Sequence, residues 1–102
     1  MAKAYWVASV DVNNPEHYKQ YVRENAAAFR KYGGKFLVRG GEQEVVEGKL
    51  RSRVVVVEFE DYATAMACYR SPEYSAAMLH RTESAFSDVV IIQGYDGPQP
   101  TD

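Results

Sequence analysis

The sequence lacks the features that mark several large classes of protein. Its 102 residues include one cysteine, Cys68, which excludes an intrachain disulfide and a cysteine-rich zinc site. No apolar run approaches the roughly 18–20 residues that a membrane-spanning helix needs. The opening Met-Ala-Lys-Ala-Tyr-Trp does not follow the basic and then apolar order of a signal peptide. We therefore expect a cytoplasmic protein without a membrane partner.

The sequence also has no excess of positive charge. Twelve Lys and Arg residues stand against fourteen Asp and Glu residues, which gives a formal net charge of −2. A nucleic-acid-binding protein normally carries a clustered basic surface. We therefore expect no nucleic-acid partner.

The composition that remains is that of one globular domain. Hydrophobic residues make up 46% of the chain and charged residues 25%, which is the usual balance of a folded protein. A chain of this length normally forms a single domain. The proline- and glycine-containing segment 97–102 favours neither a helix nor a strand interior. We expect a domain over residues 1–96 and a flexible tail over 97–102.

Helix and strand signals alternate along this domain. Aromatic and β-branched residues predict strands at residues 4–12, 35–39, 53–60 and 89–92. Capping side chains predict helices after Asn13-Asn14, after Asp61 and after Ser71, the last running to about Ser84. The pair Gly33-Gly34 ends the first helix, and the pair Gly40-Gly41 predicts a bulge or bend. The order βαββαβ predicts a ferredoxin-like α+β fold, a four-stranded antiparallel sheet with helices on one face.

Two of the predicted strands are apolar on both faces. Residues 54–57 are four valines, and residues 89–92 read Val-Val-Ile-Ile. Because helices cover only one face of such a sheet, the other face would expose a larger apolar patch than monomers usually tolerate. A second copy of the chain, packed sheet to sheet, would cover it. We expect a homodimer through the sheet face.

Several segments together resemble one known family. They are Pro15-Glu16 with Tyr18 and Tyr21, Phe36 to Gly41, Glu47-Gly48, Val57 to Phe59 and Tyr69 to Tyr74. In this order they resemble the family called domain of unknown function 1330, of the dimeric α+β barrel superfamily, over about Tyr5 to Gly94. The resemblance implies a ferredoxin-like protomer and a dimeric barrel, and it lends no activity.

The wider superfamily is similar in fold to small monooxygenases, lactone isomerases and haem-degrading enzymes, but a fold does not fix a function. One departure from the family is Asp61-Tyr62, where many relatives carry Pro or Ser before the second helix. This change concerns helix capping rather than the candidate site.

Arg39 is the first candidate catalytic residue. It ends an apolar strand just before Gly40-Gly41, where a ligand can approach the backbone closely. Its guanidinium group could hold a carboxylate or enolate oxygen by two parallel hydrogen bonds. The alternative is a structural salt bridge between subunits or between strands, for example to Glu58 or Glu47.

Glu58 is the second candidate catalytic residue. It follows four valines and precedes Phe59, so it lies either at a solvent-exposed strand end or in a desolvated space. In the second case its carboxylate could serve as a general base.

A group of tyrosines and one asparagine are candidate ligand-binding residues. They are Tyr5, Tyr18, Asn25, Tyr69 and Tyr74. The tyrosine hydroxyls could donate to a substrate oxygen in a cavity between helices and sheet, although aromatic side chains at helical spacing also form ordinary core. A polar side chain on the first helix's apolar stripe, Asn25, needs a ligand or a backbone carbonyl as partner.

The remaining polar residues have simpler interpretations. His17 and His80 lie in different predicted helices without metal-ligand spacing, so solvent exposure is expected for both. Arg81 faces the apolar stripe of the last helix and could reach a pocket or a carboxylate, and the salt bridge to a carboxylate is the favoured interpretation. We find no zinc, haem or phosphate-loop signature, and expect neither a metal nor another cofactor.

Three functions fit these observations. The first is a cofactor-independent enzyme on a small organic molecule, with Arg39 binding an oxyanion and Glu58 or a tyrosine as acid or base. The second is a non-catalytic protein that binds a small ligand in the same pocket. The third is a structural dimer with a filled core.

Overall fold

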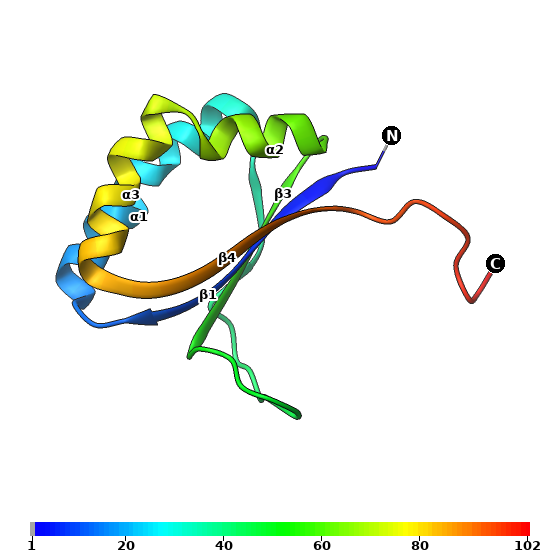
Figure 1. The fold of residues 1–102 in the computed structure, drawn as a ribbon, viewed down its shortest axis with the longest axis horizontal. Coiled ribbons are helices and arrows are strands. Elements are labelled where there is room, and N and C mark those ends of the chain that lie inside the picture. Colours follow the sequence, from blue (N-terminus) through cyan, green and yellow to red (C-terminus); the bar gives the residue numbers. More distant parts are fainter. Residues whose placement is uncertain (1) are drawn as a thin grey trace.

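The computed structural model describes residues 2–102, and its helices and strands follow the order expected from the sequence (Figure 1). These elements are β1 (Ala4–Val12), α1 (Pro15–Tyr32), β2 (Lys35–Arg39), β3 (Arg53–Phe59), α2 (Tyr62–Tyr69), α3 (Pro72–Ser84) and β4 (Ala85–Gln93).

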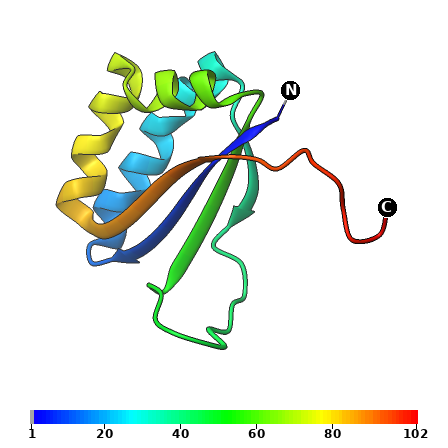
Figure 2. The same ribbon diagram turned by 45° about the vertical axis from the view of Figure 1, so that its right-hand side comes forward.

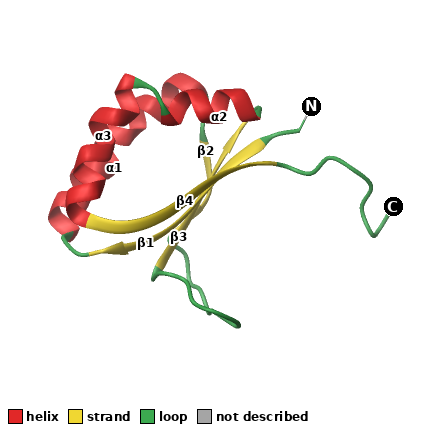
Figure 3. Cartoon of the chain, viewed as in Figure 1, coloured by secondary structure: helices red, strands yellow, loops and turns green. Residues whose placement is uncertain are grey.

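The four strands form one antiparallel sheet in the order β2-β3-β1-β4. All three helices lie on the same side of this sheet, and the other side has no helix over it (Figure 3). The arrangement confirms the predicted ferredoxin-like α+β fold. Within one chain the sheet has two free edges, at β2 and β4, and is not closed into a barrel.

The helices begin where capping residues were expected. The side chains of Asn14, Asp61 and Ser71 each accept a hydrogen bond from the backbone N–H three residues later, at 3.2, 2.7 and 3.1 Å. Such bonds satisfy N–H groups that the first turn of a helix leaves without a partner. Gly33, with φ of 72°, ends α1 in the left-handed conformation that glycine adopts easily.

Two boundary predictions differ from the structure. Strand β4 begins at Ala85 rather than at Val89, because Ala85 is buried and pairs with Val12 directly after α3 ends. The irregularity of β2 lies between Phe36 and Val38, not at the predicted glycine pair. Residues 42–47 form no helix or strand.

The core is built around Trp6, which is 4% exposed. Its ring centroid lies 4.8–5.6 Å from those of four other aromatic side chains, namely Phe29, Phe59, Tyr69 and Tyr74. The indole Nε1 donates a hydrogen bond of 2.9 Å to the carbonyl oxygen of Ala65 in α2. Trp6 therefore joins the centre of the sheet to both the helix layer and the aromatic cluster.

The strand register separates the two faces of the sheet. Val57 on β3 is buried toward the helices, while its neighbour Val56 points to the uncovered face. On that face, paired residues form a row of four valines across all four strands: Val38, Val56, Val7 and Val90. The continuous apolar runs in the sequence are thus split between the core and the uncovered face.

Two segments extend away from the body of the domain (Figure 2). One is the connection between β2 and β3, residues 40–52, and the other is the C-terminal segment after β4. The boundary predicted at residue 97 and the flexibility of the tail stay predictions. Among the described residues, no helix has the length and apolar character needed to cross a membrane.

Candidate functional site

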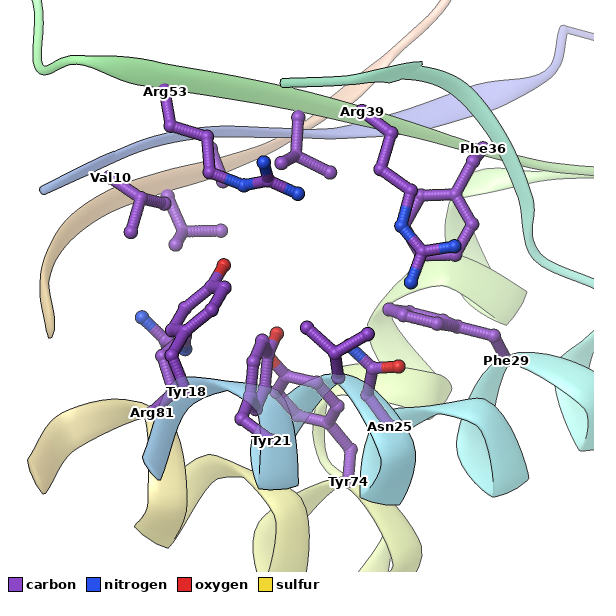
Figure 4. Close-up of a pocket in the computed structure, with 14 residues that line it drawn as sticks. Val10, Tyr18, Tyr21, Asn25, Phe29, Phe36, Arg39, Arg53, Tyr74 and Arg81 are labelled. Atoms are coloured by element: carbon purple, nitrogen blue, oxygen red, sulfur yellow. The ribbon is translucent and has the colours of Figure 1, made fainter. Parts of the chain in front are cut away.

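A small cavity lies between the sheet and the helices α1 and α3 (Figure 4). Its volume is about 40 Å³. Apolar side chains from the sheet and from α1 form part of its wall. Its polar lining consists of Tyr18, Tyr21, Asn25, Arg39, Arg53, Tyr74 and Arg81. The cavity therefore combines an apolar wall with several converging polar groups, as ligand sites commonly do.

Burial distinguishes the floor of the cavity from its rim. Tyr74, Asn25 and Arg81 are 2%, 4% and 7% exposed, so they form the floor. Arg53 is half-buried, and Arg39 is exposed at the end of β2. Arg39 therefore marks the rim, and Tyr21, which is 8% exposed, belongs to the floor with the three residues above.

Two tyrosine hydroxyls meet at the floor. The hydroxyl oxygens of Tyr21 and Tyr74 are 2.7 Å apart and share a hydrogen bond. Burial raises the pKa of Tyr21 well above its ordinary value, and the neighbouring Tyr74 adds to this shift. Burial also raises the pKa of Tyr74, although the nearby Arg81 opposes the effect. Both hydroxyls therefore stay protonated at neutral pH and act as donors rather than as bases.

The absence of a side chain at Gly40 leaves room for the Arg53 guanidinium group at the cavity. A Cβ atom on Gly40 would overlap the Arg53 guanidinium group, and the φ of Gly40 is +68°. Both conditions favour glycine at this position. Gly40 thus allows close approach of a side chain from β3, whereas Gly41 has no such neighbour in the described part of the chain, and the predicted bulge lies elsewhere.

Arg39 lines the cavity but has a different neighbour from those expected. Its guanidinium carbon lies 4.0 Å from the ring centroid of Phe36, a cation–π contact. Among the described residues Arg39 forms no ion pair, so the interstrand salt bridge to Glu58 or Glu47 is absent, and the inter-subunit salt bridge stays a prediction. Stacking on Phe36 leaves the polar edge of the guanidinium group available to a ligand.

Glu58 and Tyr5 lie on the uncovered face of the sheet. The two residues are paired across β3 and β1, one position from the buried Val57 and Trp6. The Glu58 carboxylate forms an ion pair of 3.0 Å with Lys3. Because side chains alternate along a strand, neither residue can line the helix-side cavity. The expectation that Glu58 and Arg39 act in one site is therefore not met.

Tyr69 is likewise outside the cavity lining. Its ring packs against Trp6 and Tyr74, with centroid distances of 5.6 Å to each, and its hydroxyl contacts the sulfur of Met78 at 3.9 Å. It belongs to the aromatic core. Of the five predicted ligand-binding residues, the cavity thus brings together Tyr18, Asn25 and Tyr74.

His17 and His80 are not separate, solvated side chains. Their ring nitrogens Nε2 and Nδ1 are 3.0 Å apart, and both rings are half-buried between α1 and α3. Helix packing accounts for the contact, which no spacing along the sequence indicates. The carboxylate of Glu83 lies 3.7 Å from His17. In residues 2–102, no group of three or more His, Cys, Asp or Glu side chains is placed to hold a metal ion.

The sequence interpretation missed Arg53 altogether. Its signal is the strand period, because Arg53 has the same parity as the buried Val57 and so points toward the helices. Arg81 was noticed on the apolar stripe of α3, but the favoured carboxylate partner is absent from the described ion pairs. Both arginines line the cavity, and Arg53 points into it (Figure 4).

Cys68 is buried in α2, and burial raises the pKa of its thiol to about 12. A thiol protonated at neutral pH and closed to solvent reacts slowly, because the thiolate is the nucleophile. We expect no labelling by a thiol-reactive disulfide reagent at pH 8 in the native protein and one equivalent after denaturation. Rapid labelling without denaturant would contradict this placement.

Comparisons with known proteins give a family and a fold. The model of the family described as domain of unknown function (DUF1330) matches residues 3–95, so the chain belongs to that family. No curated protein matches the chain.

Two solved structures illustrate the likeness in fold. A protein of unknown function from Rhodopseudomonas palustris, RPA0582, is 20% identical, with a TM-score of 0.74 over 94% of this chain and 85% of that one. SnoaB from Streptomyces nogalater, described as a cofactor-independent oxygenase, is 14% identical, with a TM-score of 0.63 over 97% and 96% of the two chains. At these identities the likeness shows the ferredoxin-like α+β fold alone.

Proposed function

We propose that this chain is a homodimeric, cytoplasmic α+β barrel protein that takes a small organic molecule into its helix-side cavity and acts on it without a cofactor. The observation that carries this proposal is the convergence of polar groups from the sheet and from two helices on one cavity. Nucleic acid and membranes are not among the proposed partners.

Arg39 is proposed to bind an oxyanion of the ligand, while Tyr18, Asn25 and Tyr74 orient it. Donors fixed in advance around a developing negative charge stabilise a transition state more than they stabilise the substrate. None of the lining residues is a carboxylate or a histidine. Catalysis here would therefore depend on oxyanion stabilisation, and Glu58 has no place in it.

The catalytic and the purely binding forms of this proposal differ in one respect. The likeness in fold to SnoaB, which is described as a cofactor-independent oxygenase, favours the catalytic form. Binding alone needs only the cavity. Both forms contrast with a ligand-free structural dimer, which would not need unpaired polar atoms in its core.

A ligand screen with an activity readout tests the proposal. Small acids, phenols and lactones are added to the protein, binding is followed by the melting temperature, and products are followed by mass spectrometry. A rise in melting temperature together with a product supports an enzyme, and a rise without product leaves a binding protein. If no compound raises the melting temperature, both forms are wrong.

The Arg39→Gln variant tests the oxyanion role. We expect kcat to fall by about 10²–10³-fold, the usual loss when one oxyanion donor is removed. The matched control is Arg30→Gln, which makes the same change of charge at an exposed residue on α1 outside this cavity. Equal turnover by the two variants would count against the role of Arg39.

The dimer is proposed to form through the uncovered face of the sheet. Its valine row ends on β4 at Val90, which is 51% exposed in one chain, and the neighbouring β4 side chains Phe86 and Ile92 are 64% and 52% exposed. Burial of such a face in a two-fold pair removes this apolar surface from water. The cavity lies on the other side of the sheet, so pairing leaves it open.

A further inference from the structure

The cavity has positive charge without a matching negative charge. Its lining includes three arginines, Arg39, Arg53 and Arg81, and no aspartate or glutamate. None of the three forms an ion pair with any described residue. A buried or half-buried cation without a counter-charge lowers stability, so the arrangement calls for an anion from outside the chain.

A neighbouring arginine shows that this lack of partners is local. Arg51, two residues before Arg53, forms ion pairs with Asp11 at 3.1 Å and with Asp88 at 2.9 Å. Both of those carboxylates belong to the uncovered side of the sheet. Arg51, outside the cavity, therefore has carboxylate partners within the chain, whereas the arginines that line the cavity have none among the described residues.

Two buried arginine donors in the cavity have no hydrogen-bond acceptor in residues 2–102. The Nε atoms of Arg53 and Arg81 are buried and have no hydrogen-bond partner among the described residues. Tyr21 and Tyr74 share one hydrogen bond, which uses one of their two hydroxyl protons. Two guanidinium donors of the cavity thus lack acceptors within the described chain, which a buried site normally supplies. The unpaired buried acceptor in the same described lining is Oδ1 of Asn25.

The size of the cavity limits what these donors can hold. One water needs about 10–15 Å³ of such space, so 40 Å³ accommodates roughly three waters or one carboxylate group. A complete drug-sized ligand needs several hundred Å³. The buried part of the ligand is therefore small, and any larger body must extend past the exposed Arg39.

We infer that the ligand is a small organic acid, whose carboxylate lies among Arg53, Arg81 and the Tyr21–Tyr74 pair while its body extends toward Arg39. This inference rests on the proposed ligand-binding function and adds the chemical class. A guanidinium group presents two parallel donors that match a carboxylate in shape. The raised pKa of both tyrosines suits them to donate to an anion.

Calorimetric titration in low-chloride buffer tests the inference with matched probes. Acetate, pyruvate and benzoate are compared with acetamide, methylglyoxal and benzamide, which resemble them in shape but carry no charge. We expect saturable binding of at least one acid and binding of its neutral counterpart at least about tenfold weaker, because hydrogen bonds to charged groups are the stronger ones. Nitrate, a planar inorganic anion, is titrated as a further comparison.

Variants then assign the binding to these arginines. Arg81→Gln and the less buried Arg53→Gln are each expected to weaken acid binding about 10- to 100-fold. Arg30→Gln, at an exposed position outside the cavity, is expected to leave it unchanged. Because Arg53 is half-buried, its variant keeps the test decisive if Arg81→Gln does not fold.

Each contrary result has a distinct meaning. If neutral probes bind as tightly as the acids, or both arginine variants bind acids normally, the acid class is wrong and the ligand-binding proposal stands. Equal binding of nitrate and the acids would also overturn the organic-acid class. If no probe binds and no compound of the wider screen raises the melting temperature, the proposed function itself is wrong.

Discussion

Replacing Val7 with aspartate is expected to convert the proposed dimer into monomers at micromolar concentration. Val7 lies in β1, a central strand, and pairs with Val56 on one side and Val90 on the other. In a sheet-to-sheet dimer the new carboxylate would be buried without a partner in each of two protomers. At roughly 3 kcal/mol for each such charge, the dissociation constant would rise by about 10⁴-fold. Sedimentation equilibrium measures this change directly.

The control for Val7→Asp introduces the same residue elsewhere. Val46 is 81% exposed in the connection between β2 and β3 and is not part of the valine row. Val46→Asp is expected to sediment as the unaltered protein does. A wild-type monomer at micromolar concentration would rule out the dimer, and a dimeric Val7→Asp protein would place the interface on another surface.

The same variant separates pairing from ligand binding. The cavity faces α1 and α3, whereas Val7 faces away from the helices. A folded Val7→Asp monomer should therefore keep its affinity for a ligand. Loss of both properties together would indicate that the second copy shapes the cavity.

Local rules along the chain were enough to predict the fold. The caps at Asn14, Asp61 and Ser71 and the glycine at residue 33 involve neighbours within a few residues, so the sequence displays them directly. The start of β4 was misplaced because it depends on the pairing of Ala85 with Val12, which lies far away in the sequence. The polar and small residues before Val89 lack the apolar pattern of a strand, so the sequence did not indicate that β4 begins at Ala85.

The candidate site was predicted less well because it depends on which face each side chain occupies. Glu58 looked catalytic beside four valines. Side chains alternate along β3, however, so Glu58 lies on the face of the sheet opposite to that of the buried Val57 and Phe59. Arg53 lies on the same face as those buried residues and was overlooked because it is the first residue of the strand. The contact between His17 and His80 depends on how two helices pack, which spacing along the sequence does not encode.

The largest expected loss of stability follows from replacing Trp6. In Trp6→Ala the aromatic cluster loses its central ring, and such buried large-to-small changes cost about 3–5 kcal/mol. The carbonyl of Ala65 also loses the indole donor. A domain of this size is stable by roughly 5–15 kcal/mol, so the melting temperature should fall by about 15–30 °C.

Two further variants divide that loss into its causes. Trp6→Phe keeps an aromatic ring but leaves the buried Ala65 carbonyl without its donor, so we expect a loss of about 1–3 kcal/mol. Leu79→Ala, at a side chain that is 65% exposed on α3, should change stability by no more than about 0.5 kcal/mol. Urea unfolding followed by circular dichroism measures all three variants. If Trp6→Ala cost no more than Leu79→Ala, the core would not be centred on this indole.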